Sequence, residues 1–324
     1  MKYLPVAVDS AMGQLGDFVK EILIVNDGSN DGTKDYLSDL CDARVRVIDI
    51  NPNKGRSNAR NMVVKSMCSD WLMWLDDDDI LVPDAVAKSI EFVKSNPDAD
   101  IVYCDHIASD DDLKPKHLTP SFSYPQDQML MYMMYENFIQ HGASMIRREV
   151  FNRIGGYDLQ LDRGEDHDVW VRAIIAGCKF YHNKQALYCF RYHQGNVGNA
   201  QVTRFQSKYH CSIVQRALSL SKLETIFPLL NWSNDPQGSA AVAMILLTRI
   251  FFDHGDDESA LECINYSIDF KPLPVTRMMR GLILRMMNKD KEALEALVEV
   301  AKDTQPDLIP FCAPVGTQRG SYAG

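Results

Sequence analysis

Short apolar segments that do not alternate with polar residues are separated by helical patterns through the first hundred residues. The segments 20–25, 45–50, 71–75 and 101–104 are mostly apolar, the first of them is rich in β-branched residues, and helical spacing of apolar residues lies between them, as in 56–66. Strands that are apolar on both faces need helices on both faces of their sheet. The pattern therefore predicts an α/β fold with a mostly parallel sheet.

Polar clusters follow two of these predicted strands at the point where each strand ends. The first strand runs into the turn residues 26–29, which include Asp27, and the third runs into four consecutive aspartates, Asp76 to Asp79. Ligands of parallel α/β sheets bind beyond the carboxyl ends of the strands. We therefore expect Asp27 and the aspartate run to lie at a binding cleft.

The aspartate run needs a compensating cation. Adjacent carboxylates repel one another, and a divalent Mn²⁺ or Mg²⁺ ion with oxygen ligands suits them. In an extended segment, Asp76 and Asp78 would point to one side and Asp77 to the other. The alternative is a solvated acidic loop, although the apolar strand before the run favours a site. A calcium loop beginning at Asp27 is excluded, because its twelfth position is Ser38 instead of a glutamate.

Two further motifs lie later in the chain. Gly155 and Gly156 precede an acidic cluster, 165–168, that opens a predicted helix. The helix dipole stabilises such carboxylates, so a structural role alone explains them, and the alternative is a general base. Arg191 and His193 follow a strand at 186–190, and an arginine there suits a phosphate group.

Composition excludes several classes of protein. The chain of 324 residues carries 34 basic and 44 acidic residues, a formal net charge of −10, so we expect no nucleic-acid partner. Its apolar runs are too short for a transmembrane segment. Its eight cysteines are scattered without metal-binding spacing, which is typical of buried thiols in a reducing compartment. We expect a cytoplasmic protein, free or peripheral at the inner face of the membrane.

The back of the chain follows helical patterns from about residue 240. A shift of 34 residues superposes Pro272 on Pro306 and Ile264 on Val298, which resembles tetratricopeptide helix pairs. An ordinary helical region is an equal alternative. We predict three parts: an α/β domain over 1–210, a helical, tetratricopeptide-like region over 211–309, and a loosely ordered tail over 310–324.

Taken in order, the motifs of the first 200 residues resemble the family 2 inverting glycosyltransferases, which have the GT-A fold of nucleotide-diphospho-sugar transferases. The matching stretches are EILIVNDGSNDGT at 21–33, NKGRSNARN at 53–61, WLDDDDILVP at 74–83, IGGYD at 154–158, EDHDVW at 165–170 and YH at 192–193. Each stretch is modest alone, and the ordered set is specific.

The resemblance implies roles for nine residues. The nucleotide-binding set would be Asp27 at the nucleobase, Arg60, Asp76, Asp77 and Arg191; the metal ligands Asp78, Asp76 and His193; and the catalytic pair Asp166, as the base, with Glu165 beside it. The donor would be a nucleoside-diphosphate sugar, first a UDP-sugar, and the cofactor Mn²⁺ or Mg²⁺. The acceptor would be a hydroxyl of a glycan or lipid-linked molecule in polysaccharide, lipopolysaccharide or other glycan synthesis. Inversion needs one base and no enzyme nucleophile, and its transition state resembles an oxocarbenium ion.

The first ten residues depart from the family pattern. They read as the helix that follows the family's first strand, so we expect that strand to be missing and its neighbours to be left with unpaired edges. This favours a second hypothesis, an impaired relative whose C-terminal helices dock a protein partner. The presence of Asp78 and Asp166 favours the enzyme. A nucleotidyltransferase is less favoured, because no Gly-rich, basic phosphate loop follows the first strand.

Overall fold

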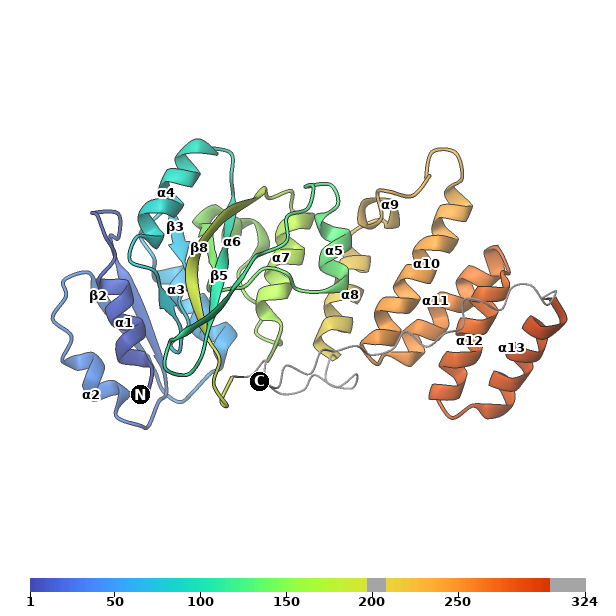
Figure 1. Cartoon of the computed structure of the whole chain (residues 1–324), viewed down its shortest axis with the longest axis horizontal. Coiled ribbons are helices and arrows are strands. Elements are labelled where there is room, and N and C mark those ends of the chain that lie inside the picture. Colours follow the sequence, from blue (N-terminus) through green and yellow to red (C-terminus); the bar gives the residue numbers. More distant parts are fainter. Residues whose placement is uncertain (197–207, 304–324) are drawn as a thin grey trace. The chain divides into compact units, whose positions relative to one another are not determined.

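The computed structural model describes residues 1–196 and 208–303 and divides the chain into two compact units, Met1–Leu229 and the residues from Leu230 onward (Figure 1). The strands, all in the first unit, are β1 (Ile22–Asp27), β2 (Val45–Ile50), β3 (Trp71–Met73), β4 (Ile80–Leu81), β5 (Ile101–Ser109), β6 (Pro115–Thr119), β7 (Ser144–Arg147) and β8 (Phe180–Arg191). The helices of that unit are α1 (Leu4–Met12), α2 (Thr33–Ser38), α3 (Arg56–Ser66), α4 (Ala85–Ser95), α5 (Met129–Tyr135), α6 (Arg148–Ile154), α7 (Glu165–Ile175), α8 (Lys208–Leu220) and α9 (Leu223–Ile226).

The strands form two sheets in the described residues. β1 and β2 pair in parallel, in register from Ile22 with Val45 to Asp27 with Ile50. The larger sheet has the order β3-β7-β5-β8-β4, and β6 adds to β5. Its central strands β5, β7 and β8 carry the most deeply buried apolar side chains, including Ile101, Ile146 and Tyr188. The expected helix over the first ten residues is confirmed as α1.

The prediction of a mostly parallel sheet is wrong. Only β1 with β2 and β5 with β8 pair in parallel among the described strands, whereas β3/β7, β4/β8, β5/β6 and β5/β7 are antiparallel. Apolar composition reports that both faces of a strand are covered, but it carries no information on direction. β4 and β7 enter the sheet from loops and run against their neighbours.

The second unit is helical in its described part. Its helices are α10 (Pro236–Asp253), α11 (Asp257–Phe270), α12 (Pro274–Met286) and α13 (Asp290–Asp303), and each packs on the next in sequence. Asp235 and Asp256 cap α10 and α11 by accepting backbone N–H groups. Pro306 and the predicted tail over 310–324 lie outside the described residues, so the repeat character stays a prediction.

The boundary between the units differs from the predicted position. Residue 210 lies inside α8, and α8 belongs to the first unit because it packs on α7. Arg216 of α8 forms ion pairs with Asp158 and with the fully buried Asp168, which fix the helix there.

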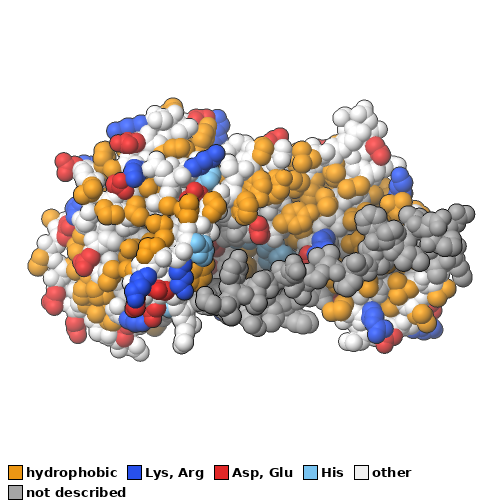
Figure 2. Space-filling model, viewed as in Figure 1, with side chains coloured by type: hydrophobic (Ala, Val, Ile, Leu, Met, Phe, Trp, Pro, Cys, Tyr) orange, Lys and Arg blue, Asp and Glu red, His pale blue; other side chains and the backbone are white. Residues whose placement is uncertain are grey.

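Charged side chains of both signs lie on the surface of the first unit. On the face in Figure 2, acidic and basic side chains are interspersed over the first unit and do not gather into a basic patch. Within residues 1–196 and 208–303, no helix is both long and apolar enough to cross a membrane.

Candidate active site

The aspartate run forms a turn rather than the extended segment that we expected. The N–H of Asp79 donates to the carbonyl of Asp76 at 3.2 Å, which bends the chain between β3 and β4. Asp76 and Asp78 stay half-exposed, whereas Asp79 is only 1% exposed. The four carboxylates are therefore not equivalent, and one of them belongs to the core.

The hydroxyl of Tyr188 in β8 forms hydrogen bonds with both ends of this turn. Its hydroxyl donates to Asp79 Oδ2 at 2.6 Å and accepts the N–H of Asp76 at 3.4 Å, while the N–H of Arg191 donates to Asp79 Oδ1 at 2.7 Å. Burial raises the pKa of Asp79 to about 7, although these hydrogen bonds oppose the shift. Tyr188 is not among the predicted site residues, because nothing local in the sequence connects it with Asp79, 109 positions earlier.

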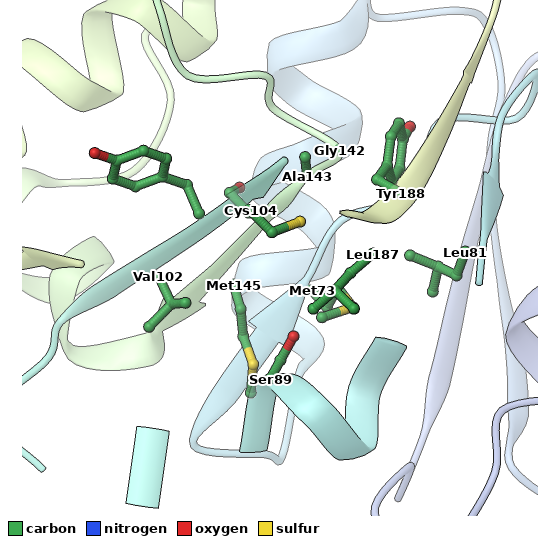
Figure 3. A pocket seen from close by; sticks show the side chains of 12 residues that line it. Met73, Leu81, Ser89, Val102, Cys104, Gly142, Ala143, Met145, Leu187 and Tyr188 are labelled. Carbon is green, nitrogen blue, oxygen red and sulfur yellow. The ribbon is translucent and has the colours of Figure 1, made fainter. Parts of the chain in front are cut away.

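Gly142 leaves room for this ring. Figure 3 shows Gly142 beside Tyr188, and a Cβ at that position would overlap the phenol oxygen. The neighbouring apolar cavity, lined by Met73, Leu81 and Leu187 among others, measures about 10 Å³. It is far too small for a nucleotide and is a packing void behind the turn.

We predict that Tyr188→Phe lowers the free energy of unfolding by about 1–3 kcal/mol, because it removes a buried donor from Asp79. Urea unfolding measures this directly. The matched control is Tyr181→Phe, whose hydroxyl donates to the exposed Asp98 at 3.0 Å and should change stability by less than about 0.5 kcal/mol. Equal losses of unfolding free energy in the two variants would show that the buried hydrogen bond stabilises the protein no more than the exposed one.

Arg60 of α3 joins the aspartate turn to the start of α7. Its guanidinium lies 3.5 Å from Asp76 and forms a shorter ion pair with Glu165, which Arg56 also contacts at 3.3 Å. Burial opposes the charge of Arg60, but nearby groups, Asp76 first and then Tyr157, Glu165 and Asp166, raise its pKa overall. Its Cζ atom lies 5.7 Å from the centroid of the Tyr157 ring and 5.9 Å from that of the Trp74 ring, within range of cation–π contacts.

The two predicted catalytic carboxylates differ sharply. The side chain of Glu165 is 3% exposed and lies between the two arginines, which places it as an ion-pair partner. Asp166 is half-exposed, and its Oδ2 accepts a hydrogen bond from Asn137 Nδ2 at 2.9 Å. Asp166 is thus the carboxylate that a substrate can reach.

Arg191 and His193 come together with Asp78. His193 Nε2 lies 3.0 Å from Asp78 Oδ2, and Asn196 donates to the same oxygen at 3.4 Å. Arg191 is 4% exposed, and its Nε and Nη1 donate to the carbonyls of Asp78 and Asp111. Its Nη2 has no hydrogen-bond partner among residues 1–196 and 208–303. A buried guanidinium with an unused donor beside this turn suits an anion.

The remaining predicted residues are placed as follows. Asp27 ends β1, and its two oxygens accept the N–H groups of Lys54 and Gly55 at 2.8 Å, so the carboxylate shapes the 53–55 turn. Asp77 is exposed in the aspartate turn, and desolvation followed by the charge of Asp78 raises its pKa. Asp76 pairs with Arg60 at 3.5 Å. In the described part of the chain, no group of three or more His, Cys, Asp or Glu side chains is arranged to hold a metal ion.

Comparison with known proteins identifies the domain. Residues 1–155 match the family model "Glycosyl transferase family 2". An uncharacterized glycosyltransferase of Methanocaldococcus jannaschii is 24% identical over 55% of this chain and 62% of its own length, and the succinoglycan biosynthesis protein ExoO of Rhizobium meliloti is 27% identical over 59% and 57%. Chondroitin synthase of Pasteurella multocida is 26% identical over 68% of this chain and 22% of its own length. The match therefore spans less than two thirds of these relatives.

Solved structures agree on the fold. The structure of Staphylococcus aureus TarS 1–349 in complex with UDP has a TM-score of 0.53 at 15% identity and covers 94% of this chain and 89% of its own. The mannosyltransferase PcManGT of Pyrobaculum calidifontis, in complex with GDP-Man and Mn²⁺, has a TM-score of 0.53 at 13% identity and covers 94% and 84%. The resemblance seen in the sequence is confirmed: the chain contains a glycosyltransferase family 2 domain with the GT-A fold, followed by a helical region.

Proposed function

We propose that the chain is a metal-dependent inverting glycosyltransferase that moves a sugar from a nucleoside-diphosphate sugar, first a UDP-sugar, to a hydroxyl of a glycan or lipid-linked acceptor. One observation carries the proposal: Arg60 contacts both Asp76 of the aspartate turn and Glu165, the neighbour of Asp166. Arg60 therefore links the proposed metal-binding turn to the start of α7, where the accessible carboxylate of Asp166 lies. The names of the relatives ExoO and chondroitin synthase support a polysaccharide product.

Asp78 and His193 would supply two donors to a divalent ion, fewer than a complete protein site has. Asp78 and His193 are within 3.0 Å of each other, and Asp76 lies in the same turn. Carboxylate and imidazole ligands suit Mn²⁺, and Mg²⁺ accepts one or two carboxylates together with substrate phosphates. Two or three protein ligands would leave coordination positions for the diphosphate. A bound ion would neutralise charge on the nucleoside-diphosphate leaving group.

The chain's own residues would supply the remaining chemistry. Arg191, held under the turn, would donate its unused Nη2–H to a diphosphate oxygen, and Asp77 and Asp27 would border the nucleotide. Asp166 would accept the proton of the acceptor hydroxyl as that oxygen attacks the anomeric carbon from the face opposite the leaving group. The carboxylate Glu165 would keep Arg60 and α7 in place and would not take the proton.

The test is nucleotide binding by calorimetry with UDP and GDP, in Mn²⁺ and in chelator, followed by nucleotide release from a panel of UDP- and GDP-sugars. We expect binding to weaken by more than about tenfold in chelator. Asp78→Asn should remove this metal dependence, whereas Asp127→Asn, an exposed aspartate of the same unit, should preserve it. Equal affinity with and without metal would reject the metal site.

A second candidate is a scaffold that binds a protein partner through the second unit. It is favoured by large apolar side chains that are exposed on α11, α12 and α13, among them Tyr266, Leu282, Met286 and Leu294. A folded chain that binds no nucleotide and releases none from any donor would favour this function over the enzyme.

A further inference from the structure

Asn137 contacts the proposed base directly. It lies two residues after the end of α5, and its Nδ2 donates to Asp166 Oδ2 at 2.9 Å. The N–H of Ile139 donates to Asn137 Oδ1 at 3.3 Å. This second bond determines which way the amide points, because the oxygen must face the backbone and the NH₂ group must face the carboxylate.

The segment that carries Asn137 is anchored on both sides. Phe138 and Ile139 are 9% and 1% exposed, and the Phe138 ring packs edge-on against Tyr124 at 4.9 Å. α5 and α7 are joined beside it, because His167 Nε2 lies 2.7 Å from the carbonyl of Met133 in the buried interior. The amide is therefore presented to Asp166 from a fixed backbone.

A fixed amide restricts how the carboxylate can turn. The terminal torsion of an aspartate is broad, so an exposed Asp166 would sample many orientations of its two oxygens. With Oδ2 held by Asn137, Oδ1 keeps one direction, and it accepts no hydrogen bond from the described residues. Transfer of a proton to a base requires a heavy-atom distance of about 2.6–3.2 Å and correct alignment. An oxygen that is held in the correct orientation therefore raises the rate of the proton transfer.

We propose that Asn137 is a positioning residue for glycosyl transfer: it holds Asp166 Oδ2 so that Oδ1 receives the proton of the acceptor hydroxyl. This inference rests on the proposed function, in which Asp166 is the base. Asn137 itself need not touch the donor or the reacting atoms.

The test is a double-mutant cycle with Asn137→Ala and Asp166→Asn, read as kcat and as KM for the donor. Losing a hydrogen bond to a charged group should lower kcat by about tenfold to a hundredfold and leave the donor KM unchanged. In the Asp166→Asn background the same change should cost nothing further, because its effect is transmitted through the carboxylate. An equal factor in both backgrounds, or no loss in a folded Asn137→Ala protein, would overturn the inference.

Two additional variants separate positioning from folding. Asn137→Asp keeps the size of the side chain and the acceptor for the Ile139 N–H, but it faces Asp166 with a negative charge, so it should lose at least as much kcat. Asn152→Ala is the matched control, because its amide also donates to a carboxylate, Glu149, at 2.9 Å on the surface, and it should retain activity. If Asp166→Asn alone keeps full turnover, the proposed base fails. If Asp166→Asn is inactive and Asn137→Ala is normal, only the positioning role fails.

Discussion

Asp166→Asn is expected to lower the turnover number by roughly 10²- to 10⁴-fold, the usual contribution of a general base. The amide is nearly the same shape as the carboxylate, so the start of α7 and its packing should persist. The amide cannot accept the proton of the acceptor hydroxyl at neutral pH, so the substitution should slow the chemical step and leave the other steps unchanged. Donor affinity should stay nearly constant, because the groups proposed to bind the donor lie at the aspartate turn and on Arg191.

The measurement is single-turnover transfer together with calorimetry of the nucleotide. Asp162→Asn provides the control, since it removes a negative charge four residues earlier from an exposed position. Turnover near the parent rate in Asp166→Asn would move the base to another residue. Parallel loss of transfer and of donor binding would mean that Asp166 serves the donor instead.

Glu165→Ala is expected to lower the free energy of unfolding by about 3 kcal/mol, at the lower end of what breaking a buried ion pair costs. Arg60 would lose its closest carboxylate while its side chain is only 12% exposed, although Asp76 at 3.5 Å would remain. Arg56, which is half-exposed, can turn to water, and this limits the loss.

Chemical denaturation tests this value against Glu91→Ala, an exposed glutamate of α4 that should change stability by less than about 0.5 kcal/mol. The variant Glu165→Gln distinguishes a structural role of Glu165 from a role in the reaction. A protein that stays folded and still transfers sugar would assign Glu165 to the framework. A fully stable Glu165→Gln protein without turnover would instead make Glu165 part of the chemistry.

Several features of the site could be predicted because they are local. An apolar strand must be buried, so polar residues that follow it come out at the end of the strand, and Asp76 and Asp78 do lie, half-exposed, in the turn after β3. The acidic start of α7 was visible because carboxylates favour the first turn of a helix. The burial of Glu165 against Arg60 and the contact of the half-exposed Asp166 with Asn137 were not visible, since neighbouring acidic residues look equivalent until their partners are known.

The amino-acid sequence by itself determined the α/β character of the first unit, the helical second part and the family motifs, because each depends on hydrophobic spacing over a few residues. Only the tertiary structure decided the antiparallel strand directions, the burial of Asp79 against Tyr188, the pairing of Glu165 with Arg60 and the contact of Asn137 with Asp166. Those partners are separated by 29 to 109 residues. Contacts over such separations are chosen by the packing of the whole domain, on which local periodicity carries no information.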